Sequence, residues 1–434
     1  MKIWVAGGGL SGCEAAWHLA QWGHDVTLYE MRPLKNTLAH QTSLLGELVC
    51  SNSLGADGET VGGLLKEELR RCGSLIMAAA DAHPVPAGRA LAVDRLAFAT
   101  HIDVQVRSKV QVVEKELTSL PEGPGILATG PMTSEGLARH LADRVGCDHL
   151  SFFDAVAPVI DDASIDKSKL YLKDRHVPFE GQADYLNIPL DKEGYERFVA
   201  ELVAAERVVH DFEKGDFFEG CMPIEVMAAR GVDSLRFGPL RPVGLELPDG
   251  SRPYAVAQLR RETVDGESWN LVGFQTNLKW GEQSRVFGLL PGLEKARFHR
   301  YGVMHRNIFL NAPKTLSELR LAENLWVAGQ LTGVEGYLES TAMGLVAAQK
   351  LQAQHLGFEA TWPEETAIGS LLAHLRRQVK NFQPQNVNRG VFPPLEGRYK
   401  RRDRPAKDAA LLARAREAFD AHVAGWLAAL STQA

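Results

Sequence analysis

The sequence predicts an α/β protein whose parallel-sheet domain is interrupted by an inserted α+β domain. Two observations lead to this prediction. A strand–glycine–helix unit opens the chain at residues 2–30, and a second unit of the same kind occurs near residues 324–355. The stretch between them mixes short apolar strands with a helix near residues 193–206. Because two such units are typical of one nucleotide-binding core, we expect residues 1–150 and 300–434 to form that core discontinuously, with residues 151–299 inserted.

The first unit contains the parts of a dinucleotide-binding motif in order. A short apolar strand, Lys2 to Ala6, runs directly into a loop with the spacing G-x-G-x-x-G, which reads Gly7-Gly8-Gly9-Leu10-Ser11-Gly12. An alanine-rich helix and a second strand follow, and Glu30 ends that strand. Glu30 lies about twenty residues after the loop, where a carboxylate hydrogen-bonds an adenosine ribose.

Each glycine has a physical role in such a loop. Gly7 permits the tight turn, Gly9 lets the backbone approach a pyrophosphate, and Gly12 allows close packing of helix on strand. The free N–H groups and the positive dipole end of the helix then favour phosphate. The unit predicts a Rossmann-like domain that binds an adenine dinucleotide, and a glycine-rich turn without a ligand is the alternative.

The second unit favours FAD over NAD as the dinucleotide. A buried strand, Asn324 to Gly329, leads through a glycine-containing turn into a helix from about Leu338, and an earlier strand ends at Gly130. A simple NAD domain has no such returning strand, so we expect a glutathione-reductase-like FAD domain. The candidate cofactor residues are Gly7, Gly8, Gly9, Leu10, Ser11, Gly12, Glu30, Arg32, Gly130, Gly329, Gly333, Gly336 and Tyr337.

Periodicity also predicts the elements that follow the first unit. Residues 61–80 are expected to form one helix, because leucines recur on successive turns. Residues 91–101 are expected to form another helix, and residues 104–113 a valine-rich strand. The tail over residues 408–430 has the pattern of an amphipathic helix.

Composition limits the function classes. No apolar run approaches the roughly 18 residues that span a bilayer, which predicts a cytoplasmic protein without a membrane contact. The net charge is −6, so a nucleic acid would need a local basic patch. The five cysteines are widely spaced without C-x-x-C, which argues against a disulfide framework and against a metal site of the zinc-ribbon type.

Two cysteines have the surroundings of a site. Cys221 stands between Gly220 and Pro223, which suggests a rigid, exposed turn, and nearby cations would make its thiol a nucleophile. Cys50 precedes Ser51 in a polar, turn-like segment that fits the wall of a site. For both residues a structural role is the alternative.

Two further segments carry groups suited to ligand contacts. The segment 301–307 includes His305, Arg306 and Asn307, which can stack on or hydrogen-bond a heteroaromatic ring. A basic cluster near the C-terminus suits RNA phosphates, although a solvated surface is the alternative. Its members are Arg398, Lys400, Arg401 and Arg402.

Together these segments resemble the TrmFO family of folate- and FAD-dependent tRNA (uracil-5-)-methyltransferases over essentially the whole chain. The resemblance is carried, in order, by residues 7–30, 31–33, 49–55, 220–225, 301–307 and 333–340. Gly8 and Ser11 stand where the family often has alanine, and residues 330–332 also vary. No phosphate-facing glycine is lost by these departures.

The resemblance implies methylation at C5 of the T-loop uridine, tRNA position 54. It implies a one-carbon unit from 5,10-methylenetetrahydrofolate and reducing equivalents from NADPH or NADH through FAD. Cys221 would add to uracil C6, with Cys50 assisting, while His305 and Tyr337 would flank the pterin and the flavin. Arg306 and Asn307 would share the folate side, and the basic cluster would contact tRNA.

Two other functions remain open at this point. One is a GidA-like wobble-uridine modification enzyme, although such enzymes are longer than these 434 residues. The other is a small-molecule FAD oxidoreductase without an RNA substrate. The sequence leaves open which thiol adds to C6, the choice between NADH and NADPH, and whether the protein is a monomer or a homodimer.

Overall fold

The computed structural model describes residues 1–37, 39–145, 149–155, 157–177, 183–208, 222–380, 382–396 and 403–433. A six-stranded sheet lies in one half of the molecule, in the order β16-β17-β7-β1-β2-β6. All neighbouring strands are parallel except the pair β16–β17. The strands are β1 (Lys2–Ala6), β2 (Asp25–Glu30), β6 (Gln111–Glu114), β7 (Gly125–Leu127), β16 (Arg320–Ala322) and β17 (Leu325–Val327).

A second six-stranded sheet is antiparallel and has its own hydrophobic core. Its order is β10-β11-β12-β13-β9-β14, and its core includes Phe198, Phe274 and Phe287. The strands are β9 (Val159–Asp161), β10 (Tyr171–Leu172), β11 (Tyr185–Leu190), β12 (Ala255–Arg261), β13 (Ser268–Leu271) and β14 (Phe298–Arg300). The accompanying helices are α6 (Lys192–Ala204), α7 (Ile224–Ala229), α8 (Ser234–Phe237) and α9 (Trp280–Phe287).

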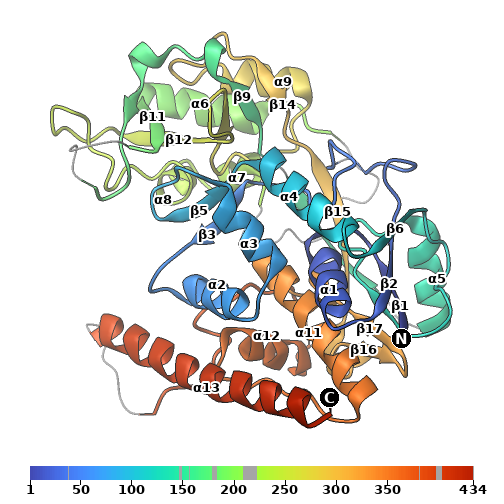
Figure 1. The fold of residues 1–434 in the computed structure, drawn as a ribbon. Helices are drawn as coiled ribbons and strands as arrows, with labels where there is room; N and C mark the ends of the chain where they lie inside the picture. The colour runs from blue at the N-terminus through green and yellow to red at the C-terminus, as the bar shows by residue number, and fades with distance from the viewer. Residues whose placement is uncertain are drawn as a thin grey trace.

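Figure 1 shows the two sheets in separate parts of the molecule. The antiparallel sheet lies at the top with α6 and α9, and β1 and β2 lie at the lower right. Two smaller sheets are β3-β5-β4 and the pair β15–β8. Their strands are β3 (Ser53–Ala56), β4 (Pro84–Val85), β5 (Ala90–Val93), β8 (His149–Ala155) and β15 (Met304–Leu310). The predicted α/β fold, with a parallel sheet and a separate inserted sheet, is therefore confirmed.

Helices cover the parallel sheet, and two of them cross closely. Gly344 makes this crossing possible, because a Cβ there would lie 2.3 Å from the carbonyl oxygen of Ser11. The crossing helices are α1 (Leu10–Gln21) and α11 (Tyr337–Leu356). The other helices of this half are α2 (Val61–Arg71), α3 (Leu75–Ala82), α4 (Arg95–Arg107), α5 (Glu135–Val145), α10 (Ala312–Thr315), α12 (Ala367–Arg376) and α13 (Arg404–Gln433).

The helix predicted over residues 91–101 is confirmed with shifted bounds, as α4, whereas the strand predicted over residues 104–113 is wrong up to residue 110. Strand β5 ends at Val93, and α4 begins after Asp94, whose carboxylate accepts the N–H groups of Leu96 and Ala97. Val106 is buried whereas Val104 is 58% exposed, so the two side chains do not share a face as they would in a strand. The strand of this region is the shorter β6.

The single helix predicted over residues 61–80 is two helices, α2 and α3. Gly73 has a φ of 75°, which ends the first helical path. The Ser74 hydroxyl then accepts the N–H of Met77 and starts α3 as its N-cap. Leucine periodicity continues across this break, and for that reason the pattern did not reveal it.

Candidate active site

A cleft of about 1030 Å³ lies at the carboxyl ends of β1, β2 and β7. The glycine loop and the start of α1 form one wall, and the segment after β7, residues 128–134, forms the opposite wall. The turn at Gly329 and Gln330 also lines the cleft. The carboxyl ends of parallel strands are where open α/β sheets bind ligands, so this cleft is the first candidate site.

The three motif glycines serve different purposes in the loop. Gly7 has a φ of 102°, and a Cβ there would lie 2.4 Å from the carbonyl oxygen of Ala128. A Cβ on Gly12 would lie 1.8 Å from the carbonyl oxygen of Gly7, so Gly12 is required by packing and does not line the cleft. Gly9 has no heavy atom within 4 Å of its Cβ position, which leaves its backbone open to the cleft.

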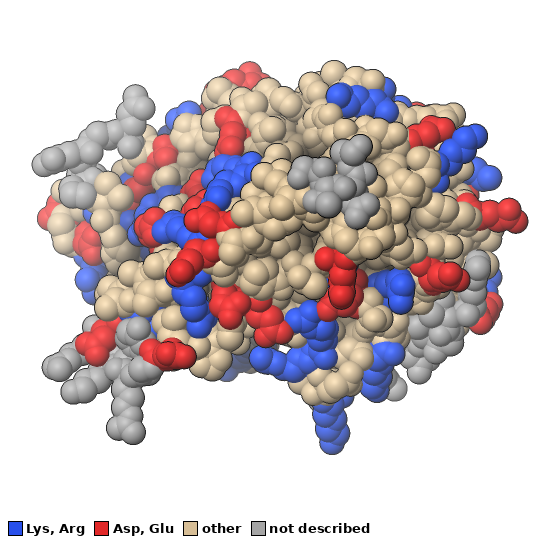
Figure 2. Space-filling model, turned by 60° about the horizontal axis from the view of Figure 1, so that its bottom comes forward, with Lys and Arg blue, Asp and Glu red and all other residues tan. Residues whose placement is uncertain are grey.

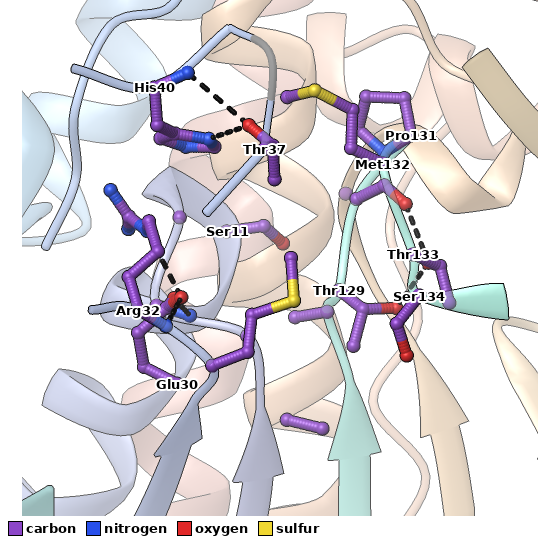
Figure 3. Close-up of a pocket in the computed structure, with 18 of the residues that line it drawn as sticks. Ser11, Glu30, Arg32, Thr37, His40, Thr129, Pro131, Met132, Thr133 and Ser134 are labelled. Carbon is purple, nitrogen blue, oxygen red and sulfur yellow. Dashed lines mark hydrogen bonds and ion pairs between the residues drawn. The ribbon is translucent and has the colours of Figure 1, made fainter. Parts of the chain in front are cut away.

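The start of α1 presents polar groups to the cleft. Gly9 is the N-cap and provides no side-chain hydrogen bond, so the first N–H groups of the helix are uncapped by its own residue. The Ser11 hydroxyl is buried, and among the residues that the structure describes its Oγ has no hydrogen-bond partner. Figure 3 shows Ser11 between the side formed by Glu30 and Arg32 and the side formed by Thr129 and Ser134. These groups suit a ligand with phosphate oxygens.

Glu30 is a buried carboxylate held by the loop and by Arg32. Its Oε2 accepts the N–H of Gly8 at 2.8 Å, and its Oε1 accepts the N–H and Nε–H of Arg32 at 2.9 and 3.0 Å. Burial opposes the charge, but the hydrogen bonds and charge of Arg32 outweigh it and hold the pKa of Glu30 below its ordinary value. Arg32 also pairs with Glu47 at 3.4 Å, and all three side chains line the cleft.

The remaining predicted glycines lie in three places, which are the cleft, an adjoining cavity and the core. Gly130 and Gly329 line the cleft, and both have positive φ angles of 67° and 72°. Gly336 is the N-cap of α11 and lines a second, adjoining cavity. Gly333 lines neither, because a Cβ there would lie 2.5 Å from the ring of Phe382.

The second cavity encloses about 1510 Å³ and is lined by Cys50. It shares five residues with the first cleft, namely Val49, Pro131, Gln330, Tyr337 and Ser340. The N–H of Cys50 donates to Tyr337 Oη at 2.7 Å. Burial, with the neighbouring Cys50, raises the pKa of Tyr337 well above its ordinary value, so the phenol stays neutral. The structure thus brings Cys50 and Tyr337 together between the two cavities.

Two buried charged side chains line this cavity, and the sequence pattern did not indicate one of them, Lys66. Lys66 of α2 donates to the carbonyl oxygen of Ala56 at 2.7 Å, and burial lowers its pKa. Glu339 of α11 accepts the N–H of Val387 at 3.0 Å, and burial raises its pKa. Lys66 looks like an ordinary surface position of a helix in the sequence, whereas Glu339 stands beside the second glycine turn, and the fold brings both to one cavity.

Several predicted site residues lie outside the described part of the chain. These are Cys221, Arg398, Lys400, Arg401 and Arg402. The backbone of His305 and Arg306 belongs to β15, but their side chains are also outside the described set. Asn307 is fully buried, pairs with Phe152 of β8 and lines neither cavity.

Comparison with known proteins defines the class. The family model described as Glucose inhibited division protein A matches residues 2–359. The structure of Aquifex aeolicus GidA superposes with a TM-score of 0.69 at 16% identity, covering 97% of this chain and 73% of that one. The protein is therefore an α/β protein of the GidA class.

Closer relatives define the family within that class. A protein of Desulforudis audaxviator (strain MP104C) is 52% identical over 98% of this chain and 97% of its own length. A protein of Lysinibacillus sphaericus (strain C3-41) is 52% identical over 90% and 91%. Both are named methylenetetrahydrofolate--tRNA-(uracil-5-)-methyltransferase TrmFO. The chain belongs to the TrmFO family, as its sequence motifs predicted.

Proposed function

We propose that this protein methylates C5 of the T-loop uridine, position 54, of tRNA. The methylene carbon would come from 5,10-methylenetetrahydrofolate, and the reducing equivalents from NADPH or NADH through FAD. The observation that carries the proposal is the 52% identity, over 98% of this chain, to a protein named as a methylenetetrahydrofolate-dependent tRNA (uracil-5-)-methyltransferase. The adjoining cavities at Tyr337 support it, because the reaction needs a cofactor site and a base site in contact.

For FAD we propose the cleft at the ends of β1, β2 and β7, in a glutathione-reductase-like domain formed by residues 1–150 and 300–434. The fit rests on three features: the open backbone at Gly9, the unpartnered hydroxyl of Ser11 and the uncapped start of α1. Glu30 would accept a ribose hydroxyl at Oε2, which accepts the N–H of Gly8 and has one lone pair left, whereas Oε1 already accepts two N–H groups of Arg32. When bound, FAD supplies hydride transfer and one-carbon chemistry at its ring.

The protein's own residues would activate and hold the base in the second cavity. Uracil C5 becomes nucleophilic only after a group adds to C6, and we propose the thiol of Cys221 for this addition, with Cys50 assisting in proton removal. Ile224, three residues after Cys221, donates its N–H to the carbonyl of Gln275 at 2.7 Å. Gln275 lines the second cavity, which supports an action of Cys221 there.

For the folate we propose contacts with His305 and Arg306 of β15. Asn307, which is buried beside them, would support the strand. The inserted domain, residues 151–299, would then face the folate from the side of β14 and β15. We also propose a cytoplasmic protein, monomeric or homodimeric. Within the described ranges, none of the helices has the length and apolar character needed to cross a membrane.

The tRNA must present its target base outside the base stack. We propose that Arg398, Lys400, Arg401 and Arg402 contact its phosphates. Figure 2 shows the face at the bottom of Figure 1, where Lys and Arg side chains are interspersed with Asp and Glu. Arg416 of α13, for example, pairs with Glu59 and Glu67. This mixture of charges favours a local contact cluster over a broad basic surface.

A second candidate is GidA-like modification of a wobble uridine, which the family match over residues 2–359 favours. The test combines the purified protein with FAD, NADPH, labelled methylenetetrahydrofolate and unmodified tRNA. Label at C5 of the T-loop uracil is expected, and a tRNA with cytidine at position 54 should receive none. Label confined to the anticodon loop would support the second candidate, and its absence from both loops would contradict both.

A further inference from the structure

The backbone around Cys50 is held by two guanidinium groups. Arg300 donates to the carbonyl oxygen of Cys50 at 2.8 Å, and Arg95 donates to the same oxygen at 3.1 Å. Arg300 also reaches the carbonyl of Val49 at 3.4 Å, and Arg95 that of Leu48. Arg95 comes from the start of α4 and Arg300 from the end of β14, so both halves of the molecule contribute one cation.

The charges at this point do not balance. Arg95 is paired with Glu262 at 3.0 Å, and the Glu262 side chain is nearly buried. Across the described ranges of the chain, Arg300 has no carboxylate within ion-pair distance, and its Nε is buried without a hydrogen-bond partner. Burial and the like charge of Arg95 lower the pKa of Arg300 to about 10, so it remains a cation at neutral pH. One positive charge is left over beside Cys50.

An uncompensated cation in a partly buried site favours a nearby anion. Covalent geometry keeps Cys50 Sγ within about 4.5 Å of its own carbonyl oxygen, and therefore within about 7 Å of the Arg300 nitrogen. Tyr337 faces the same residue from α11 as a neutral phenol, and Lys66, Glu335 and Glu339 line the same cavity. These three residues put one amine and two carboxyl groups on that wall, and burial lowers the pKa of Lys66 and raises that of Glu339.

We propose that Arg300 is a positioning residue whose unpaired charge keeps the Cys50 thiol ionised. The proton leaves Sγ for solvent, and the thiolate that remains is stabilised by the guanidinium behind its own peptide group. Glu262 works in the opposite sense, because it neutralises Arg95 and so limits the positive charge. The use of this thiolate as a base in methylation rests on the proposed function. Its ionisation does not, and can be measured separately.

The test is the pH dependence of Cys50 alkylation by iodoacetamide in the protein as purified, read by mass spectrometry of the peptide that contains Cys50. Arg300→Gln should raise the midpoint by about one unit or more. Alkylation at a pH below both midpoints should then be about tenfold slower. Arg300→Lys keeps the charge and should restore the midpoint, although it loses the paired contacts with the carbonyl groups. Glu262→Gln should lower the midpoint.

Arg297→Gln is the matched control, because Arg297 directly precedes β14, pairs with Asp161, and has a side chain that is 70% exposed. Its midpoint should equal that of the unaltered protein. Equal midpoints in Arg300→Gln and the unaltered protein would overturn the proposal. So would an equal upward shift in Arg300→Gln and Arg300→Lys, which would assign Arg300 to backbone geometry alone. If Arg300→Gln fails to fold, Glu262→Gln decides, and a midpoint that stays or rises contradicts the proposal.

Discussion

At the scale of single residues, the glycine loop shows that one motif combines two unrelated demands. Gly12 is glycine because a side chain would strike the carbonyl oxygen of Gly7, which is a requirement of the fold. A Cβ on Gly9 would lie more than 4 Å from every described heavy atom outside its chain neighbours, so packing does not require glycine there. Its lack of a side chain instead leaves room in the cleft for a ligand. The sequence motif treats these positions alike, and only the packing around each Cβ position separates them.

This difference can be tested by three alanine substitutions. Gly12→Ala should lower the free energy of unfolding by about 3 kcal/mol or more, because backbone atoms have to move. Gly9→Ala should fold, with a cost near 1 kcal/mol for the poorer N-cap, but should bind FAD more weakly because its methyl group enters the cleft. Urea unfolding and the visible absorbance of bound flavin measure the two effects.

Gly281→Ala is the control for both measurements. Gly281 lies in α9 with nothing within 4 Å of its Cβ position, so alanine there should be neutral or slightly stabilising. Unchanged flavin binding in Gly9→Ala would show that the cleft does not receive the pyrophosphate at this residue.

At the scale of elements, the sequence predicted whole units better than their boundaries, since the prediction missed the helix break at Gly73 and the helix start after Asp94. The strand–loop–helix unit of residues 2–30 and the C-terminal helix are confirmed. The strand predicted from residue 104 was wrong at its start, because the β-branched Val104 and Val106 lie on α4, which burial of Phe98, Ile102 and Val106 stabilises. The intrinsic propensity of a residue for helix or strand decides its conformation only where tertiary packing does not.

Helix α12 depends on a carboxyl group from another helix. Glu68 of α2 accepts the N–H groups of Ala367 and Ile368 at 2.7 and 2.9 Å, at the start of α12. Burial raises the pKa of Glu68 to about 8 from 4.5, so the folded protein binds a proton that the unfolded chain has released between these values. Stability should therefore fall as the pH rises from about 4.5 to 8.

Glu68→Gln should remove this part of the pH dependence, since the amide cannot ionise and still accepts one N–H group. The free energy of unfolding, obtained from urea titrations at several pH values between about 4.5 and 8, measures this pH dependence. Glu59→Gln, at a side chain that is 72% exposed and paired with Arg416, should leave the slope unchanged. A slope in Glu68→Gln equal to that of the unaltered protein would mean that Glu68 is already ionised in the folded state.

At the scale of the whole molecule, buried polar side chains join the two halves. Asn52 is fully buried and donates to the carbonyl oxygens of Val93 and Arg261, while its own oxygen accepts Arg260 Nε–H at 3.1 Å. The sequence does not predict these hydrogen bonds, because the partners Asn52, Arg260 and Arg261 are far apart in the chain. The same is true of Arg95 and Arg300, so the lining of the cleft was predictable and the setting of Cys50 was not.

Asn52→Ala should weaken this joint, by which we mean the hydrogen bonds of Asn52 to Val93, Arg260 and Arg261. It leaves buried carbonyl groups without a donor, which costs about 1–3 kcal/mol. Hydrogen exchange should rise at residues 48–53 and 260–262, on both sides of the joint. Asn187→Ala is the control, because Asn187 is equally buried but donates only to Tyr171, Lys173 and Tyr185 in the antiparallel sheet. Increased exchange confined to the same segments in both variants would contradict a joint at Asn52.

The five residues common to the two cavities line both of them, at the place where the cavities adjoin. A molecule that fills the cleft beside the glycine loop would contact Tyr337, which also lines the second cavity. Thermodynamic linkage makes any effect of this contact on the second cavity mutual. If a ligand in the first cleft changes the affinity of the second cavity for its ligand, the second ligand changes the affinity of the first cleft by the same factor. If FAD binds in the cleft as proposed, it and a base in the second cavity would therefore change each other's affinity by the same factor.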